Sequence, residues 1–140
     1  MQLTNIFATF AVLLATGSNL VQAGCYKRGE KIDASVALEH ATRACKGYEE
    51  GGQQKAGVLQ GFFDAEAKKT GCMNINDARR HIEYEVKNTN KNSGFDLDDG
   101  DCVTGFSMLI NDCDRGGDHE GTGWFFRLIH VLDKRGVVKF

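Results

Sequence analysis

The chain contains no proline, and its first 23 residues contain no Lys, Arg, Asp or Glu. Without proline, the turns must depend on glycine, of which there are 17. There is also no Cys-x-x-Cys pair, no zinc-type Cys/His spacing and no Asn-x-Ser/Thr sequon. We therefore expect no metal, no cofactor and no N-glycosylation.

The uncharged N-terminus has the pattern of an export signal. Residues 6–15 form an apolar run that is too short to span a bilayer, and Val21 and Ala23 are small residues at signal-peptidase spacing. We predict cleavage between Ala23 and Gly24, which leaves residues 24–140 as one secreted, extracellular domain. No later apolar stretch could cross a membrane, so we expect no membrane association after cleavage. A signal anchor is the alternative interpretation of residues 1–23.

Charge is balanced in the mature part. All 17 Lys and Arg and all 19 Asp and Glu lie there, interspersed, with a net charge of -2. Because nucleic-acid binding depends on clustered positive charge, this pattern argues against a nucleic-acid partner.

Five cysteines follow the predicted cleavage site, and thiols within reach of each other become disulfides in an oxidising compartment. At most four of them can pair, and the odd thiol could link two copies into a homodimer. Cys102 and Cys113 are about three turns apart on one predicted helix, so each needs a different partner. The full set is Cys25, Cys45, Cys72, Cys102 and Cys113.

Hydrophobic periodicity predicts two helices and three strands. Apolar residues recur at helical spacing over 33–48 and 98–113, with Asp33 and several aspartates placed to cap the helix starts. Residues 56–63 are short and apolar, and 81–87 and 124–131 alternate as strands do. A helix over 75–86 is the rival interpretation of the second strand. The order predicts an α+β fold, a small layered α/β sandwich of two amphipathic helices on a three- to four-stranded sheet, braced by disulfides.

Several segments, taken in order, resemble a family of small secreted fungal glycan-binding proteins, the Y-three-like lectins typified by an antiviral protein of an ink-cap mushroom. They are ATRAC at 41–45, IEYEVKN at 82–88, DCVTGF at 101–106, NDC at 111–113, Gly116-Gly117 and GWFFR at 123–127. The resemblance implies a layered α/β fold and non-catalytic binding of complex glycans that contain N-acetylgalactosamine, in defence. The family ends in a cysteine, whereas residues 128–140 contain none. We hypothesise that this tail has diverged or reflects a gene-model error.

The segment 114–124 is the best local match to a sugar site. Sugars stack their C–H faces on aromatic rings while polar side chains bond the hydroxyls, and this glycine-rich segment, read as a mobile loop, ends on the single tryptophan. Alternatively, Trp124 begins a core strand and the loop is a solvated connector. The predicted glycan-binding residues are Asp114, Arg115, Asp118, His119, Glu120, Trp124 and, from a neighbouring strand face, Tyr84.

Two other patterns suggest chemistry. The aspartates at 96–101 resemble a calcium loop, but their register fails and helix capping explains them better. His81 and Glu83, with Arg127 or His130, could form an acid/base set like that of a small ribonuclease, although charge pairing on a solvated strand face explains them as well. We therefore expect a lectin without catalytic activity. The alternatives are a secreted effector that binds a protein target and a small ribonuclease.

Overall fold

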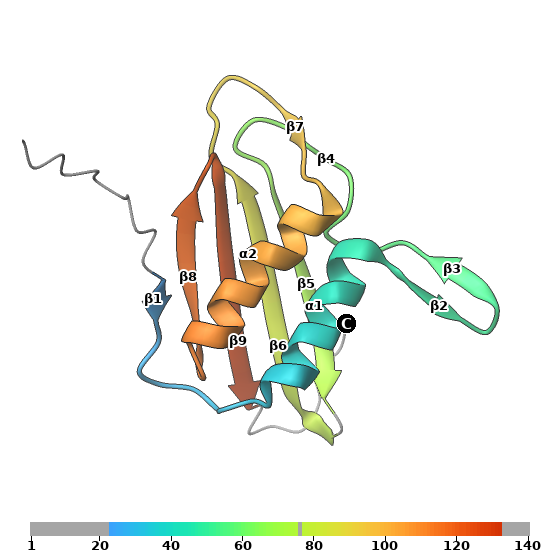
Figure 1. The fold of residues 1–140 in the computed structure, drawn as a ribbon, viewed down its shortest axis with the longest axis vertical. Helices are drawn as coiled ribbons and strands as arrows, with labels where there is room; N and C mark the ends of the chain where they lie inside the picture. The colour runs from blue at the N-terminus through green and yellow to red at the C-terminus, as the bar shows by residue number, and fades with distance from the viewer. Residues whose placement is uncertain (1–22, 76, 133–140) are drawn as a thin grey trace, which may run out of the picture.

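The computed structural model describes residues 23–75 and 77–132. Two helices, α1 (Ala34–Lys46) and α2 (Asp99–Asp112), lie side by side on one face of an antiparallel sheet (Figure 1). The sheet has five strands in the order β1-β8-β9-β6-β5, which are Gly24–Cys25, Gly116–Gly121, Trp124–Leu132, Asp77–Asn88 and Lys68–Ile75. The predicted α+β fold is confirmed, with five strands in the sheet rather than the three or four expected.

Alternation along β6 and β9 positions the core. Ile82, Tyr84 and Val86 are completely buried beneath the helices, while Glu83 between them is exposed. In β9, Phe126 and Leu128 face the helices in the same way. The strand prediction over 81–87 is confirmed and extends to Asp77–Asn88, so the rival helix is excluded. Each of these two strands therefore has one buried face and one open face.

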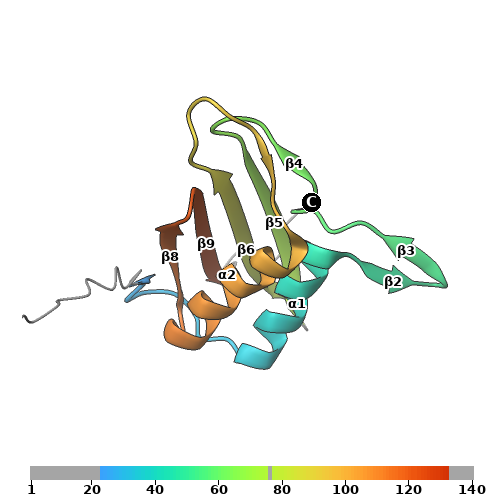
Figure 2. The same ribbon diagram turned by 45° about the horizontal axis from the view of Figure 1, so that its top comes forward.

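Capping aspartates start both helices. Asp33 accepts hydrogen bonds from the backbone N–H groups of Ser35 and Val36, and Asp98 accepts them from Gly100 and Asp101. The first helix ends at Lys46 rather than at residue 48, because Gly47 has a φ of 78°. Tyr48 instead begins β2 (Tyr48–Glu50), which pairs with β3 (Gln53–Lys55) in a hairpin that projects from the body (Figure 2).

The predicted strand over 56–63 is wrong for most of its length. Only β4 (Phe62–Phe63) is extended and paired, with β7 (Phe95–Asp96). Before it, the chain closes on the end of α1: the N–H of Leu59 donates to the carbonyl of Ala44, and a Cβ on Gly57 would lie 2.3 Å from that same oxygen. The apolar residues of this segment therefore cover a helix end.

Three strands of the sheet were not predicted: the two-residue β1, β5 and β8. Strand β5 carries lysines and a glycine, which favour strands weakly, and it pairs with β6 along its whole length. Strand β8 occupies most of the segment that we predicted to be a mobile glycine loop, so the loop prediction is wrong there. It joins β9 through Thr122 and Gly123, both with positive φ, as a two-residue type I′ hairpin turn requires.

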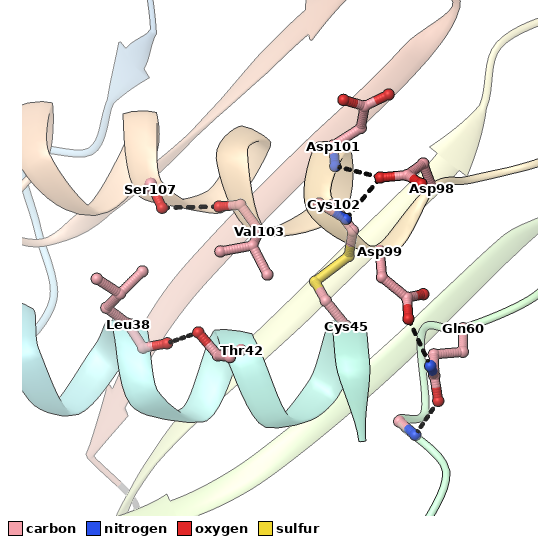
Figure 3. The surroundings of a disulfide bond; sticks show 12 residues. Leu38, Thr42, Cys45, Gln60, Asp98, Asp99, Asp101, Cys102, Val103 and Ser107 are labelled. Atoms are coloured by element: carbon pink, nitrogen blue, oxygen red, sulfur yellow. Dashed lines mark hydrogen bonds between the residues drawn. A yellow bond between two sulfur atoms is a disulfide. The ribbon is translucent and has the colours of Figure 1, made fainter. Parts of the chain in front are cut away.

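Two disulfides hold α2 near its two ends. Cys45 at the end of α1 bonds Cys102 in the first turns of α2, and Cys25 bonds Cys113 just after α2 (Figure 3 shows the first of these). Beside the first disulfide, the Gln60 amide donates to Asp99 at 2.8 Å. Cys102 and Cys113 therefore have different partners, as predicted, and Cys72 is the free thiol.

Most of the predicted signal and most of the divergent tail lie outside the described residues. Of the tail, residues 128–132 complete β9. Neither helix in the described ranges is long and apolar enough to cross a membrane.

Candidate functional site

A cavity of about 460 Å³ lies between α2 and the β8–β9 hairpin. Its walls are mainly apolar, with polar side chains contributed by both elements. The apolar lining comprises Leu97, Met108, Trp124 and Phe126, and the polar lining comprises Asp101, Thr104, His119 and Thr122. A concave, largely apolar site with a few polar groups is the usual form of a small-ligand site.

Trp124 is partly exposed where it lines this cavity. It begins β9 on the helix-facing side of the sheet, and its ring meets Phe63 edge-on with centroids 5.1 Å apart. That contact fixes the orientation of the indole. A partly exposed, rigid indole can accept the C–H face of a ligand ring.

The polar groups around the cavity come from two directions. Asp101 and Thr104 lie three residues apart on α2, so they share one side of the helix, and both are exposed. Thr122 lies at the hairpin turn and is also exposed. A carboxylate and two hydroxyls can bond ligand hydroxyls from both sides of the cavity.

His119 lines the inner wall of the cavity. Its ring stacks on Phe126 at 5.1 Å, and Nε2 donates to the carbonyl oxygen of Gly105 at 3.1 Å. Nδ1 has no hydrogen-bond partner in the described chain, although the side chain is only 8% exposed. The imidazole therefore holds the hairpin against α2 and leaves its Nδ1 without a partner among the described residues.

The other predicted glycan-binding residues do not gather with Trp124 and His119. Asp118 and Glu120 point to the opposite face of the sheet, where Asp118 accepts a 2.8 Å hydrogen bond from the Tyr26 hydroxyl. This bond and, above all, burial raise the pKa of Tyr26 to about 12. Of seven predicted residues, only Trp124 and His119 line the cavity.

Three of those residues have structural partners elsewhere. Asp114 pairs with Lys31, which lowers the pKa of its carboxyl, and Arg115 donates to the carbonyl of Gly29. Tyr84 is completely buried, and its hydroxyl donates to the carbonyl of Ala37 at 3.0 Å. Tyr84 therefore has no surface to offer a ligand.

The opposite face of the sheet carries a second cavity of about 560 Å³. Among the described elements no helix covers this face (Figure 2). Three charged residues, Glu83, Glu85 and Arg127, line it together with apolar and small residues. Arg127 lies 4.0 Å from Glu85, and Lys68 beside the cavity lies 3.6 Å from Glu85. Cys72 also lines this cavity, and burial together with the nearby Glu83 raises the pKa of its thiol to about 11.

The acid/base set suggested by the sequence is only partly assembled. His81 Nε2 lies 3.3 Å from Glu83 Oε1, but the His81 side chain is buried. His130 points to the helix side, where Nδ1 donates to the carbonyl of Glu30. In the described residues, no three His, Cys, Asp or Glu side chains gather as a metal site would require.

Asp101, Thr104 and Thr122 were missed as site residues. Helix capping accounts for the aspartate in the sequence, and nothing local in the sequence relates the outer side of α2 to the hairpin turn at Thr122. A weak signal was present, because Asp101 and Thr104 recur at helical spacing beside the predicted core stripe.

Comparison with models of known protein families found no match, and comparison with curated proteins found none. The resemblance to the Y-three-like lectins therefore stays a prediction.

Proposed function

We propose that this protein is a secreted glycan-binding protein that holds a sugar in the cavity between α2 and the β8–β9 hairpin. The observation that carries the proposal is the combination of Trp124 with Asp101, Thr104 and Thr122 around one cavity. The indole stacks on the apolar face of the sugar, and the carboxylate and hydroxyls bond its hydroxyl groups.

The class of ligand follows from the resemblance rather than from the cavity. We propose complex glycans that contain N-acetylgalactosamine, bound without catalysis, in a defence or antiviral role. Secretion is supported by the two disulfides, which are typical of an oxidising compartment, together with the uncharged N-terminal segment.

A glycan array followed by titration with the best ligand tests this proposal. We expect Asp101→Asn to weaken binding about tenfold or more, because a hydrogen bond to a charged group is worth about 1.5–3 kcal/mol. Glu120→Gln is the matched control: it removes the same charge from the same region, but from the opposite face of the sheet. Its affinity should stay within about twofold of wild type, which is well below the effect of one such bond.

Trp124 provides a second measurement, because it is the single tryptophan. Ligand binding in this cavity should shift its fluorescence, and Trp124→Phe should weaken binding while keeping a ring against Phe63. A blank array, or equal losses in the Asp101 and Glu120 variants, would reject the lectin function and leave a protein target as the better hypothesis.

A ribonuclease is supported by one contact, that between His81 and Glu83 on the open face of the sheet. The burial of His81 speaks against it, because a general base must reach its substrate. An RNA-cleavage assay of wild type and His81→Ala decides the question: cleavage that depends on His81 would replace the lectin proposal.

A further inference from the structure

Two consecutive basic residues stand exposed in the segment that joins β1 to α1. Lys27 and Arg28 lie in a bend, outside any helix or strand, and both side chains are exposed. Within the described chain, neither side chain makes a hydrogen bond or an ion pair. Arg115 and Arg127, by contrast, have polar partners in the fold: Arg115 donates to the carbonyl of Gly29, and Arg127 pairs with Glu85.

The chain on either side of the pair is anchored. The N–H of Tyr26 donates to the carbonyl of Gly116 at 2.9 Å, and the carbonyls of Gly29 and Glu30 accept from Arg115 and His130. Lys27 and Arg28 therefore form the tip of a short loop that is held at both of its ends.

An exposed loop tip is the preferred place for proteolytic cleavage. Adjacent positive side chains suit an endoprotease whose first two subsites are acidic, because the opposite charges complement each other. We propose that the Arg28–Gly29 peptide bond is a processing site for such a dibasic-specific endoprotease, encountered during the secretion proposed above. Water adds to the Arg28 carbonyl carbon, the C–N bond breaks, and the products carry a carboxylate on Arg28 and an ammonium on Gly29.

The fold distinguishes this pair from the other basic pairs of the sequence. Arg79 and Arg80 lie within β6, an inner strand whose Arg80 is paired with Leu132 of β9. Lys68 and Lys69 lie within β5, where they are paired with Lys87 and Val86 of β6. Strand pairing hinders a protease, so the sheet protects both of these sites. Lys134 and Arg135 lie outside the described residues.

Cleavage after Arg28 would not release the N-terminal piece. Cys25 remains bonded to Cys113, and β1 remains paired with β8. The product is a two-chain protein held together by a disulfide. In the processed protein the Cys25–Cys113 bond would hold two chains together, whereas in the uncut protein it only closes a loop.

The test uses the folded, secreted protein and a purified kexin-type endoprotease, with mass spectrometry before and after reduction. Without reductant, we expect the mass to rise by one water. After reduction, the fragment that ends at Arg28 should separate from a chain that begins at Gly29. Protein recovered directly from the secreting host should show the same new amino terminus.

Matched variants sharpen the test. Arg28→Gln should lower the cleavage rate at least tenfold, whereas Arg80→Gln should be cut as wild type. Arg115→Ala should be cut several-fold faster, because it frees the Gly29 carbonyl from its hydrogen bond. Absence of cleavage, cleavage of the folded protein elsewhere with Arg28–Gly29 intact, or release of the N-terminal fragment without reductant would overturn the proposal.

Discussion

Burial of single titratable groups decides how this protein responds to pH and to thiol reagents. Cys72 is the free thiol, yet burial and the charge of Glu83 hold its pKa at about 11, so it remains protonated near neutrality. Because the thiolate is the reactive form, the odd cysteine is poorly suited to rapid disulfide exchange. A homodimer through Cys72 therefore stays a prediction, and it would form slowly.

Cys72 should react slowly with a thiol reagent. A pKa raised from 9.0 to about 11 lowers the thiolate fraction about 100-fold at about pH 8, since each unit is tenfold. We expect alkylation to be slower by about that factor in the folded protein than in urea with both disulfides intact. Glu83→Gln should speed the folded reaction. Equal rates in the folded and unfolded chains would contradict the prediction.

Because of His130, we expect the free energy of unfolding to fall in mild acid. Burial lowers its pKa in the folded state, so below about pH 6.5 the unfolded chain takes up a proton before the folded one does. The unfolded state then binds more protons, and stability rises with pH through this window and falls on acidification. The partly buried His40 has a lowered pKa for the same reason and adds to the effect.

Thermal unfolding at a series of pH values checks this prediction. His130→Asn removes the titration while keeping a donor for the Glu30 carbonyl, so it should flatten the dependence below neutrality. A variant whose dependence on pH matches that of wild type would show that another group is responsible.

At the scale of elements, the position of α2 depends on a close approach to β9. Gly105 is buried in the middle of the helix, and a Cβ there would lie 2.6 Å from the ring of Phe126. Phe126 in turn packs edge-on against Phe106 and stacks with His119. The glycine thus lets α2 approach the sheet closely. This close approach brings Asp101 and Thr104 towards the hairpin.

Gly105→Ala should destabilise the protein. Alanine is the better helix former by about 1 kcal/mol, but overpacking a core costs about 1–3 kcal/mol, so steric strain outweighs propensity. We expect urea unfolding at a lower midpoint than wild type. Thr104→Ala, at the adjacent exposed position, is the control and should leave the midpoint unchanged or slightly higher. A stabilised Gly105→Ala variant would show that the ring of Phe126 moves aside freely.

For the whole molecule, two disulfides join distant parts of the chain to the same helix. They span 88 and 57 residues, and loop entropy alone gives about 4–5 kcal/mol for either one. Loop length therefore does not rank them. Their surroundings differ at one end: Cys45 and Cys102 are both buried, whereas the buried Cys113 is bonded to Cys25, which is exposed on the two-residue strand β1.

Replacing Cys45 and Cys102 by alanine should therefore cost more stability than replacing Cys25 and Cys113. The first change leaves a gap between two packed helices, and small core cavities add about 1 kcal/mol or more. The second change mainly frees the edge strand. Denaturant unfolding of both double variants measures the difference, and equal losses would indicate that loop entropy dominates.

Local patterns in the sequence already determined much of this protein. Alternation predicted β6 and β9, helical periodicity with Asp33 and Asp98 predicted α1 and α2, and helix geometry separated the partners of Cys102 and Cys113. These inferences succeed because a period or a cap depends only on residues a few positions apart.

Tertiary structure alone decided the remainder. Gly116 and Gly117 form a strand because β9 lies beside them, and residues 56–61 form a turn because α1 ends there. Trp124 acquires Asp101, Thr104 and Thr122 as neighbours through the approach of α2 to the hairpin, while Tyr84 is buried by the same layer of helices. Each outcome depends on contacts between segments far apart in the chain, which no local pattern records.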